Sequence, residues 1–186
     1  MGNARKKVLL FACVLTLSMA YSQKNIYLSR NFDELSTDHQ VLAILPFFTH
    51  LDLGEDVSKS EVKKLEEQEG YAVQDALETY FGRGKKKKKF TVDFQNSEDT
   101  NALLAQRDIS YANIDRYTIK ELSQILKVDG IVSGNMDVKV VLSDGVPDKI
   151  SLMDYILGDA NYGRIGIKIS DGGSGKLLWK YEQEIT

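Results

Sequence analysis

The sequence is poor in the residues that build covalent, metal and nucleophilic sites. Its 186 residues include one cysteine, Cys13, and two histidines, His39 and His50. A single cysteine cannot form an intramolecular disulfide or a thiolate metal site. The histidines flank the first predicted strand without the H-x-x-x-H spacing of a helical zinc site. We therefore expect no metal, no cofactor, no catalytic residues and no enzyme activity.

Long hydrophobic runs are also scarce. The run Val8 to Leu17, near the start, is shorter than the about 20 apolar residues that cross a bilayer. Basic residues precede it, and the small residues of Ser18-Met19-Ala20 follow it. This order is that of a secretory signal, so residues 1–20 are predicted to be a cleaved signal peptide. Cleavage removes Cys13 and leaves 21 basic against 27 acidic residues, a net charge of −6.

Cys13 has a second interpretation. Leu10-Phe11-Ala12-Cys13 loosely resembles a lipobox, which would make the cysteine a lipidated N-terminus. Only five apolar residues precede it, however, and the apolar run continues past it. A cleaved signal is therefore the favoured interpretation and a lipid anchor at Cys13 the alternative. Both predict a periplasmic or outer-membrane-associated protein.

One long helix is predicted after the first strand. Ser58 and Glu61 have the spacing of a capping box, and apolar residues then recur at three and four positions. Gly70 interrupts this stripe, which weakens the pattern of a single continuous helix. Gly82 and Gly84 are predicted to end it.

The remaining elements follow from apolar runs and alternations. The run Val41 to Phe48 is typical of a strand buried on both faces, and Pro46 predicts that pairing stops near its end. The other predicted elements are a strand at 90–94, a short helix at 101–106, a helix opened by the capping box of Thr118 and Glu121, a strand at 131–142, and hairpin strands at 165–170 and 178–185.

This order predicts the fold class and the domain limits. Residues 21–39 are polar and lack clear periodicity, so they are predicted to be an N-terminal extension. Residues 40–186 are predicted to form one α/β domain, a sandwich with a mixed sheet, packed helices and a C-terminal antiparallel hairpin.

Two glycine-containing segments are predicted to be structural. In Leu126 to Gly134 a helix ends and a buried strand begins almost at once, with Gly130 and Gly134 permitting the turn and close packing and Asp129 in a structural role. The segment Gly172 to Lys176 superficially resembles a phosphate-binding loop. It lacks the required spacing, because Ser170 replaces a glycine and Leu177 replaces a serine or threonine, so we predict a hairpin turn.

Three segments together resemble a known family. Val41 to Phe47 resembles its opening strand, Val128 to Gly134 its "VD-small-I-hydrophobic-x-G" signature, and Asp171 to Trp179 its closing "TGK-I/L-L-W" hairpin. The family is the CsgG-like group, which includes the curli production assembly/transport component CsgG and the LpoB-type activators of penicillin-binding proteins. The three matches occur in the family's order and span most of the mature chain.

The resemblance implies a non-enzymatic cell-envelope protein that acts by protein–protein binding in assembly or secretion at the outer membrane. The alternative is an LpoB-like periplasmic regulator of a cell-wall enzyme; a homo-oligomer favours the first role and a monomer the second. A third hypothesis, an enzyme, rests only on the frequency of catalysis on α/β sheets. Residues 143–161 are too irregular for a membrane-spanning hairpin, so no curli-type pore is implied.

Two segments are candidate interaction surfaces. A run of cations could bind an anionic surface or be a solvated turn, and it consists of Arg83, Lys85, Lys86, Lys87, Lys88 and Lys89. An apolar group could be core packing or a partner contact, and it consists of Leu152, Met153, Tyr155, Ile156 and Leu157. Nucleic acid is not expected as a partner, because the chain is acidic and has a signal sequence.

Overall fold

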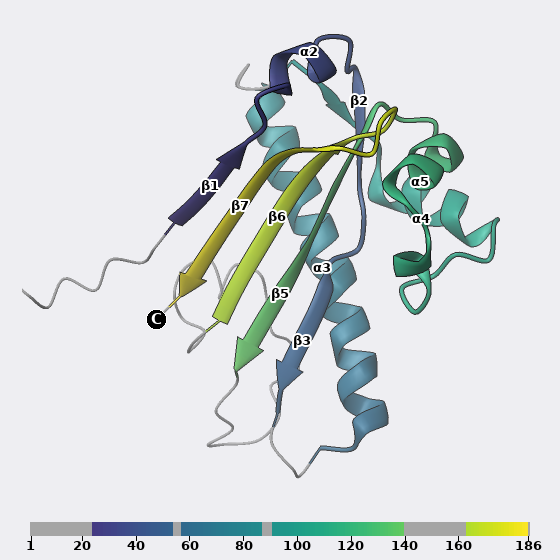
Figure 1. Ribbon diagram of the computed structural model, residues 1–186. Helices are drawn as coiled ribbons and strands as arrows, with labels where there is room; N and C mark the ends of the chain where they lie inside the picture. Colours follow the sequence, from purple (N-terminus) through teal and green to yellow (C-terminus); the bar gives the residue numbers. More distant parts are fainter. Residues whose placement is uncertain (1–23, 54–56, 87–90, 140–162, 186) are drawn as a thin grey trace, which may run out of the picture.

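The sheet is arranged around its central strand, β5 (Gly130–Lys139). The computed structural model describes residues 24–53, 57–86, 91–139 and 163–185, which form a seven-stranded sheet with packed helices (Figure 1). The strand order is β1 (Lys24–Leu28), β7 (Leu177–Ile185), β6 (Gly163–Asp171), β5, β2 (Val41–Ile44) and β4 (Asp93–Phe94), with β3 (Phe48–Asp52) also beside β5. β6 and β7 are antiparallel, whereas β2 and β3 run parallel to β5. The predicted mixed α/β sheet with a C-terminal hairpin is confirmed.

The first apolar run forms two strands rather than one. β2 pairs with Gly130 to Val132, and β3 resumes pairing with the same strand at Asn135. The break lies at Pro46, which has no N–H to donate to a ladder. The predicted stop near Pro46 is confirmed as a break in pairing. The sequence did not predict that pairing resumes at Phe48, where β3 continues the sheet.

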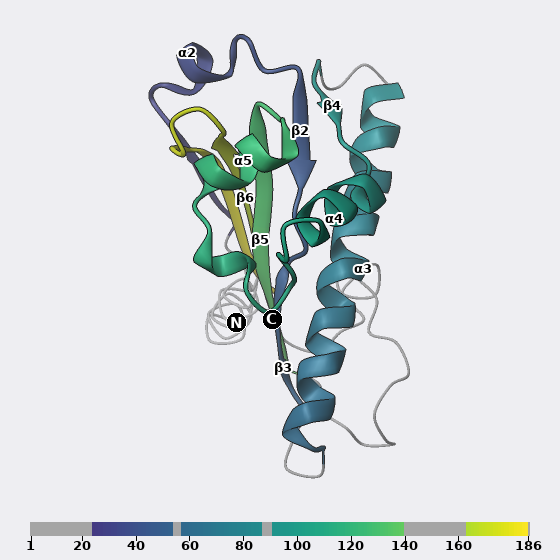
Figure 2. The same cartoon turned by 90° about the vertical axis from the view of Figure 1, so that its right-hand side faces the viewer.

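One helix, α3 (Lys59–Lys86), covers one face of the sheet (Figure 2). Its 28 residues run without interruption through Gly70 and past Gly82 and Gly84, so the predicted end was wrong. Each glycine costs a helix only about 1 kcal/mol, which a long packed helix can tolerate. At Gly70 the missing side chain is required, since a Cβ atom would lie 2.3 Å from the carbonyl oxygen of Phe47.

The shorter helices α4 (Ser97–Ala105) and α5 (Ile119–Leu126), with the turn η2 (Ile114–Arg116), belong to a second apolar cluster. Strand residues alternate between faces, so Ile44 packs with α3 and the adjacent Ala43 packs in this second cluster. The capping box of Thr118 and Glu121 is confirmed. α4 begins earlier than predicted because Asn96 caps it through its side chain.

The helix-to-strand junction packs as predicted. Val128, Ile131 and Val132 are buried in the core. Gly134 permits close packing, because a Cβ atom there would lie 2.1 Å from the carbonyl oxygen of Gly166 and 2.3 Å from the ring of Phe47. In the predicted strand 90–94, only Asp93 and Phe94 pair within the described residues.

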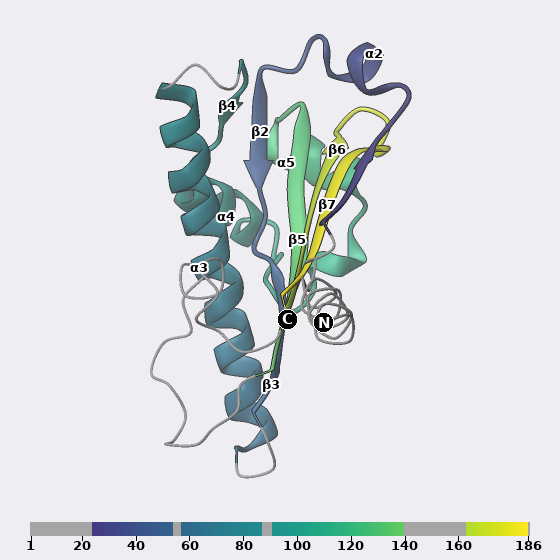
Figure 3. The same ribbon diagram turned by 90° about the vertical axis from the view of Figure 1, so that its left-hand side faces the viewer.

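The predicted polar extension contains two elements that periodicity did not reveal. β1 pairs antiparallel with β7, and α2 (Phe32–Ser36) follows it. From there the chain crosses the end of the sheet to reach β2 (Figure 3). We call residues 24–38 the N-terminal arm.

Candidate functional site

The structure describes few of the predicted surface residues. Arg83 is exposed on α3, and Lys85 and Lys86 belong to the last turn of that helix. The other predicted interaction residues lie outside the described residues: Lys87, Lys88, Lys89, Leu152, Met153, Tyr155, Ile156 and Leu157. Both interaction surfaces therefore stay predictions, and the described residues offer two other candidates.

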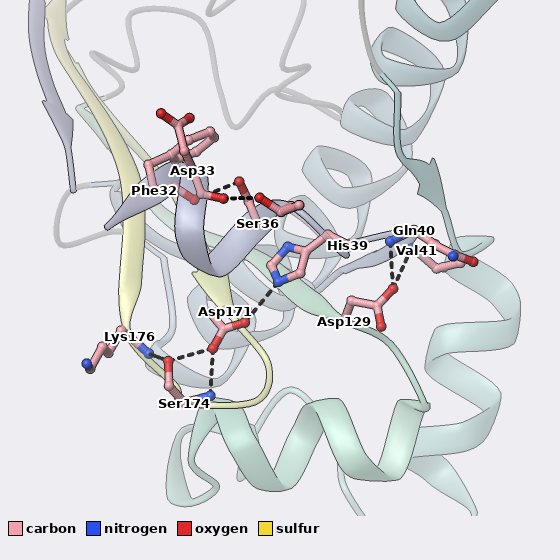
Figure 4. A network of polar contacts seen from close by, with 11 residues as sticks. Phe32, Asp33, Ser36, His39, Gln40, Val41, Asp129, Asp171, Ser174 and Lys176 are labelled. Carbon is pink, nitrogen blue, oxygen red and sulfur yellow. Dashed lines mark hydrogen bonds and ion pairs between the residues drawn. The ribbon is translucent and has the colours of Figure 1, made fainter. Parts of the chain in front are cut away.

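The first candidate is a polar junction where the three family-like segments meet (Figure 4). Oδ2 of Asp129 accepts hydrogen bonds from the N–H groups of Gln40 and Val41, at 2.8 and 2.9 Å. The N–H of Asp129 donates back to the carbonyl of Val41, at 2.9 Å, and its carbonyl accepts from the N–H of Gly172, at 2.8 Å. One residue thus joins the starts of β2 and β5 to the β6–β7 turn, as expected of a structural role.

His39 and Asp171 complete the junction. Nε2 of His39 lies 2.8 Å from Oδ1 of Asp171, and both side chains are about nine-tenths buried, with 8% and 10% exposed. Oδ2 of Asp171 accepts from the N–H and the hydroxyl of Ser174, at 2.6 and 2.5 Å. These bonds close the hairpin turn, which confirms that Gly172 to Lys176 is a turn.

The order of these groups decides what they can do chemically. In a nucleophilic triad the histidine stands between serine and carboxylate and takes the serine proton. Here Asp171 stands between His39 and Ser174, and the serine hydroxyl donates to the carboxylate. The arrangement orients the turn and does not create a serine–histidine pair.

The junction also stabilises the charged form of both carboxylates. Hydrogen bonds from the N–H groups of Val41 and Gln40 lower the pKa of Asp129, and the nearby His39 adds a smaller effect. Burial by itself would raise the pKa of Asp171. Hydrogen bonds from Ser174 and His39 outweigh it, and the pKa is lowered.

Two kinds of feature are absent from the residues that the structure describes. No group of three or more His, Cys, Asp and Glu side chains gathers there in a way that could hold a metal ion. Likewise, no helix among those residues has the length and apolar character needed to cross a membrane.

The second candidate is an apolar surface on β1, β7 and β6, which we call the outer strip. Its two cross-strand rows are Ile26–Tyr181–Ile167 and Leu28–Trp179–Ile169. The rings of Trp179 and Tyr181 stack, with centroids 6.1 Å apart and an angle of 6° between the rings.

The outer strip extends the α3-side core to the edge of the sheet. Ile167, Ile169 and Tyr181 pack against the core cluster that includes α3. At the other end of the rows, Ile26 is 65% exposed and Leu28 is 59% exposed. A run of apolar side chains that begins in the core and continues to an exposed edge is typical of a surface that another molecule covers.

Sequence reasoning missed the outer strip and the pairing of His39 with Asp171, for different reasons. The apolar Ile26-Tyr27-Leu28 was the one signal of a strand in the extension, but its seat beside the last strand depends on the topology. His39 and Asp171 are 132 positions apart, so no local pattern pairs them.

No protein-family model and no curated protein matches the chain. Among solved structures it is similar to lipoprotein GNA1162 from Neisseria meningitidis, with a TM-score of 0.47 and 12% identity over 78% of each chain. It is also similar to LpoB from E. coli, with a TM-score of 0.47 and 7% identity over 83% of this chain and 63% of that one. For the PelC dodecamer from Paraburkholderia phytofirmans the TM-score is 0.38, with 9% identity over 88% and 79%.

Proposed function

We propose that this chain is an exported, non-enzymatic envelope protein that binds other proteins in an assembly at or near the outer membrane. The observation that carries the proposal is the outer strip, an apolar surface at the edge of the sheet. The signal-like residues 1–20 and the resemblance of three segments to the CsgG-like family support the compartment.

The chemistry of the outer strip fits a protein partner. Trp179 and Tyr181 stand side by side on one strand, flanked by aliphatic side chains on both neighbouring strands. Tryptophan and tyrosine are enriched at the centres of protein interfaces, because they bury a large area with few rotatable bonds. The cations at Arg83 and Lys85–Lys89 and the apolar group at 152–157 are further proposed contacts.

A non-enzymatic role also fits the polar junction. Its buried polar side chains are used in hydrogen bonds that connect β2, β5 and the β6–β7 turn. Asp129 accepts only from main-chain N–H groups in these bonds, as a structural carboxylate does.

Site-specific photo-crosslinking in intact cells tests the proposal. A photoreactive amino acid at Leu28, on the outer strip, is expected to give protein adducts in the envelope fraction. The matched control is Lys168, an exposed position on the opposite face of the same sheet, which is expected to give few adducts.

Adducts at both positions in equal yield, or a chain that fractionates with the cytoplasm, would contradict the proposal. The mass of the adduct is informative as well. A product of two copies of this chain favours an assembly, whereas a monomer crosslinked to a cell-wall enzyme favours the regulator role.

A further inference from the structure

The N-terminal arm is attached to the rest of the protein at its two ends. At one end β1 pairs with β7 over five residues, and the N–H of Ser29 donates to the carbonyl of Leu178, at 2.8 Å. At the other end His39 bonds to Asp171, and the N–H of Gln40 bonds to Asp129. The arm crosses the ends of β7, β6 and β5 between these points (Figure 3).

The side chains of the arm contribute little buried surface. No residue from Asn25 to Asp38 is buried, and four of the five residues of β1 are exposed on both faces of the strand. α2 has no buried residue and no side-chain N-cap. β1 is therefore held mainly by main-chain hydrogen bonds, whose net gain is small against the entropy of ordering a strand.

A strand held in this way can be replaced by another strand with the same main-chain pattern. The edge of β7 beneath it offers unpaired N–H and C=O groups whenever β1 leaves, and such edges recruit strands from other chains. β1 is also the edge strand of the described sheet, so among the described strands it pairs with β7 alone.

We propose that the N-terminal arm is exchanged between copies, so that β1 of one molecule pairs with β7 of another. The β1 strand of a second copy can pair with β7 in the same register, because it has the same sequence as the strand that pairs there within one molecule. The junction at His39 and Asp171 stays within each molecule and anchors the arm at its base.

Exchange also brings a second copy to the outer strip. The donated arm joins the two molecules at this edge of the sheet, where Ile26 and Leu28 are 65% and 59% exposed and would gain from burial. In a single molecule the short connection keeps the local concentration of the arm high, so the closed form dominates in dilute solution and exchange rises with protein concentration.

Disulfide trapping between two separately prepared chains tests the exchange. Both carry Cys13→Ser, which removes the only cysteine; one also carries Asn25→Cys and the other Glu182→Cys. These positions are antiparallel partners on β1 and β7, and they lie on the face opposite to the outer strip. After mixing and oxidation, we expect a mixed 25–182 disulfide between the two chains, which bear tags of different size.

The control pair is Ser133→Cys with Lys168→Cys, antiparallel partners on β5 and β6 on the same face of the sheet. These two strands are joined inside the core sheet and cannot be exchanged without unfolding. The 25–182 product is expected to form at least about tenfold faster than the 133–168 product, because only the arm has its partner strand accessible. Equal rates for the two pairs would overturn the exchange.

A locked arm provides a second readout. With Asn25→Cys and Glu182→Cys in the same chain, an internal disulfide fixes the arm, and the mass in light scattering is expected to stay that of a monomer. The reduced form is expected to increase in mass with concentration; no increase would contradict the exchange.

The inference rests on the proposed function in treating the outer edge as an assembly surface. Adducts at Leu28 with other proteins, but no 25–182 product, would leave that function standing and remove only the exchange.

Discussion

Gly70 lowers the helix propensity of α3 but is required by the packing around it. Alanine is the better helix former by about 1 kcal/mol, so local propensity alone would favour replacing this glycine. Its missing side chain leaves room for the carbonyl oxygen of Phe47 and the ring of Tyr111, which lie 2.3 and 2.5 Å from where a Cβ atom would be. The close approach of α3 to the break between β2 and β3 therefore depends on this position.

We expect Gly70→Ala to lower the free energy of unfolding by about 2 kcal/mol or more, because backbone must shift to admit the methyl group. The matched control is Gly82→Ala in the same helix, where a Cβ atom meets nothing within 4 Å. That change is expected to stabilise the protein by about 0.5–1 kcal/mol. Urea unfolding measures both, and a Gly70→Ala protein as stable as the parent would contradict the close packing.

At the scale of elements, one buried side chain connects three of them. Gln74 of α3 has no exposed surface, and its Nε2 donates to the carbonyl of Ile44 in β2, at 2.6 Å, and to Oδ1 of Asn101 in α4, at 3.1 Å. Nδ2 of Asn101 donates back to Oε1 of Gln74, at 2.9 Å. The amide pair orients α3 and α4 relative to the end of β2.

Gln74→Leu keeps the size of the side chain but leaves the partners on β2 and α4 without their hydrogen bonds. We expect a loss of about 2–4 kcal/mol in the free energy of unfolding, since buried polar groups without partners cost about 1–3 kcal/mol each. Gln68→Leu, at an exposed position of the same helix, is the control and should change stability by less than about 0.5 kcal/mol. Similar losses for the two variants in thermal or urea unfolding would argue against the role of the amide pair.

The elements also show where sequence patterns succeed and fail. The capping box at Thr118 and the alternation of β6 are local, and the structure has both. β3 and β1 were missed because their pairing depends on neighbours that are distant in sequence. The end of α3 was placed too early because propensity at Gly82 and Gly84 is weaker than the packing of the helix against the sheet.

At the scale of the whole molecule, we expect the free energy of unfolding to depend on pH through the polar junction. The pKa values of Asp129 and Asp171 are lowered in the folded state, while an unfolded chain has a carboxyl pKa of about 3.9. Their contribution is therefore present in full above about pH 4 and is lost as the pH falls through the lower folded values.

Asp129→Asn isolates one part of this effect. The amide oxygen can still accept from Gln40 and Val41, but it carries no charge, so we expect a loss of about 1 kcal/mol at neutral pH. Between pH 7 and acid pH the variant should lose less stability than the parent, because one titrating group has been removed. Urea unfolding as a function of pH measures this difference, and parallel pH profiles for the two proteins would contradict the proposed linkage.

The sequence by itself determined which segments are apolar, which alternate and where two of the helices are capped. These local properties account for the α/β class, the C-terminal hairpin, and the buried Val128, Ile131 and Val132. They also indicated that Asp129 and the turn at Gly172 to Lys176 are structural.

Only the tertiary structure decided which distant segments become neighbours. It placed the first described strand beside the last, paired His39 with Asp171, and aligned Ile26 and Leu28 with Tyr181 and Trp179 in the outer strip. The physical reason is that the periodicity of a sequence indicates which face of a strand or helix each side chain lies on. The exposure of that face depends on which other segments of the chain pack against it. α3 covers the centre of the sheet and leaves Ile26 and Leu28, at the edge of the strip, exposed, which is where we expect the next molecule to bind.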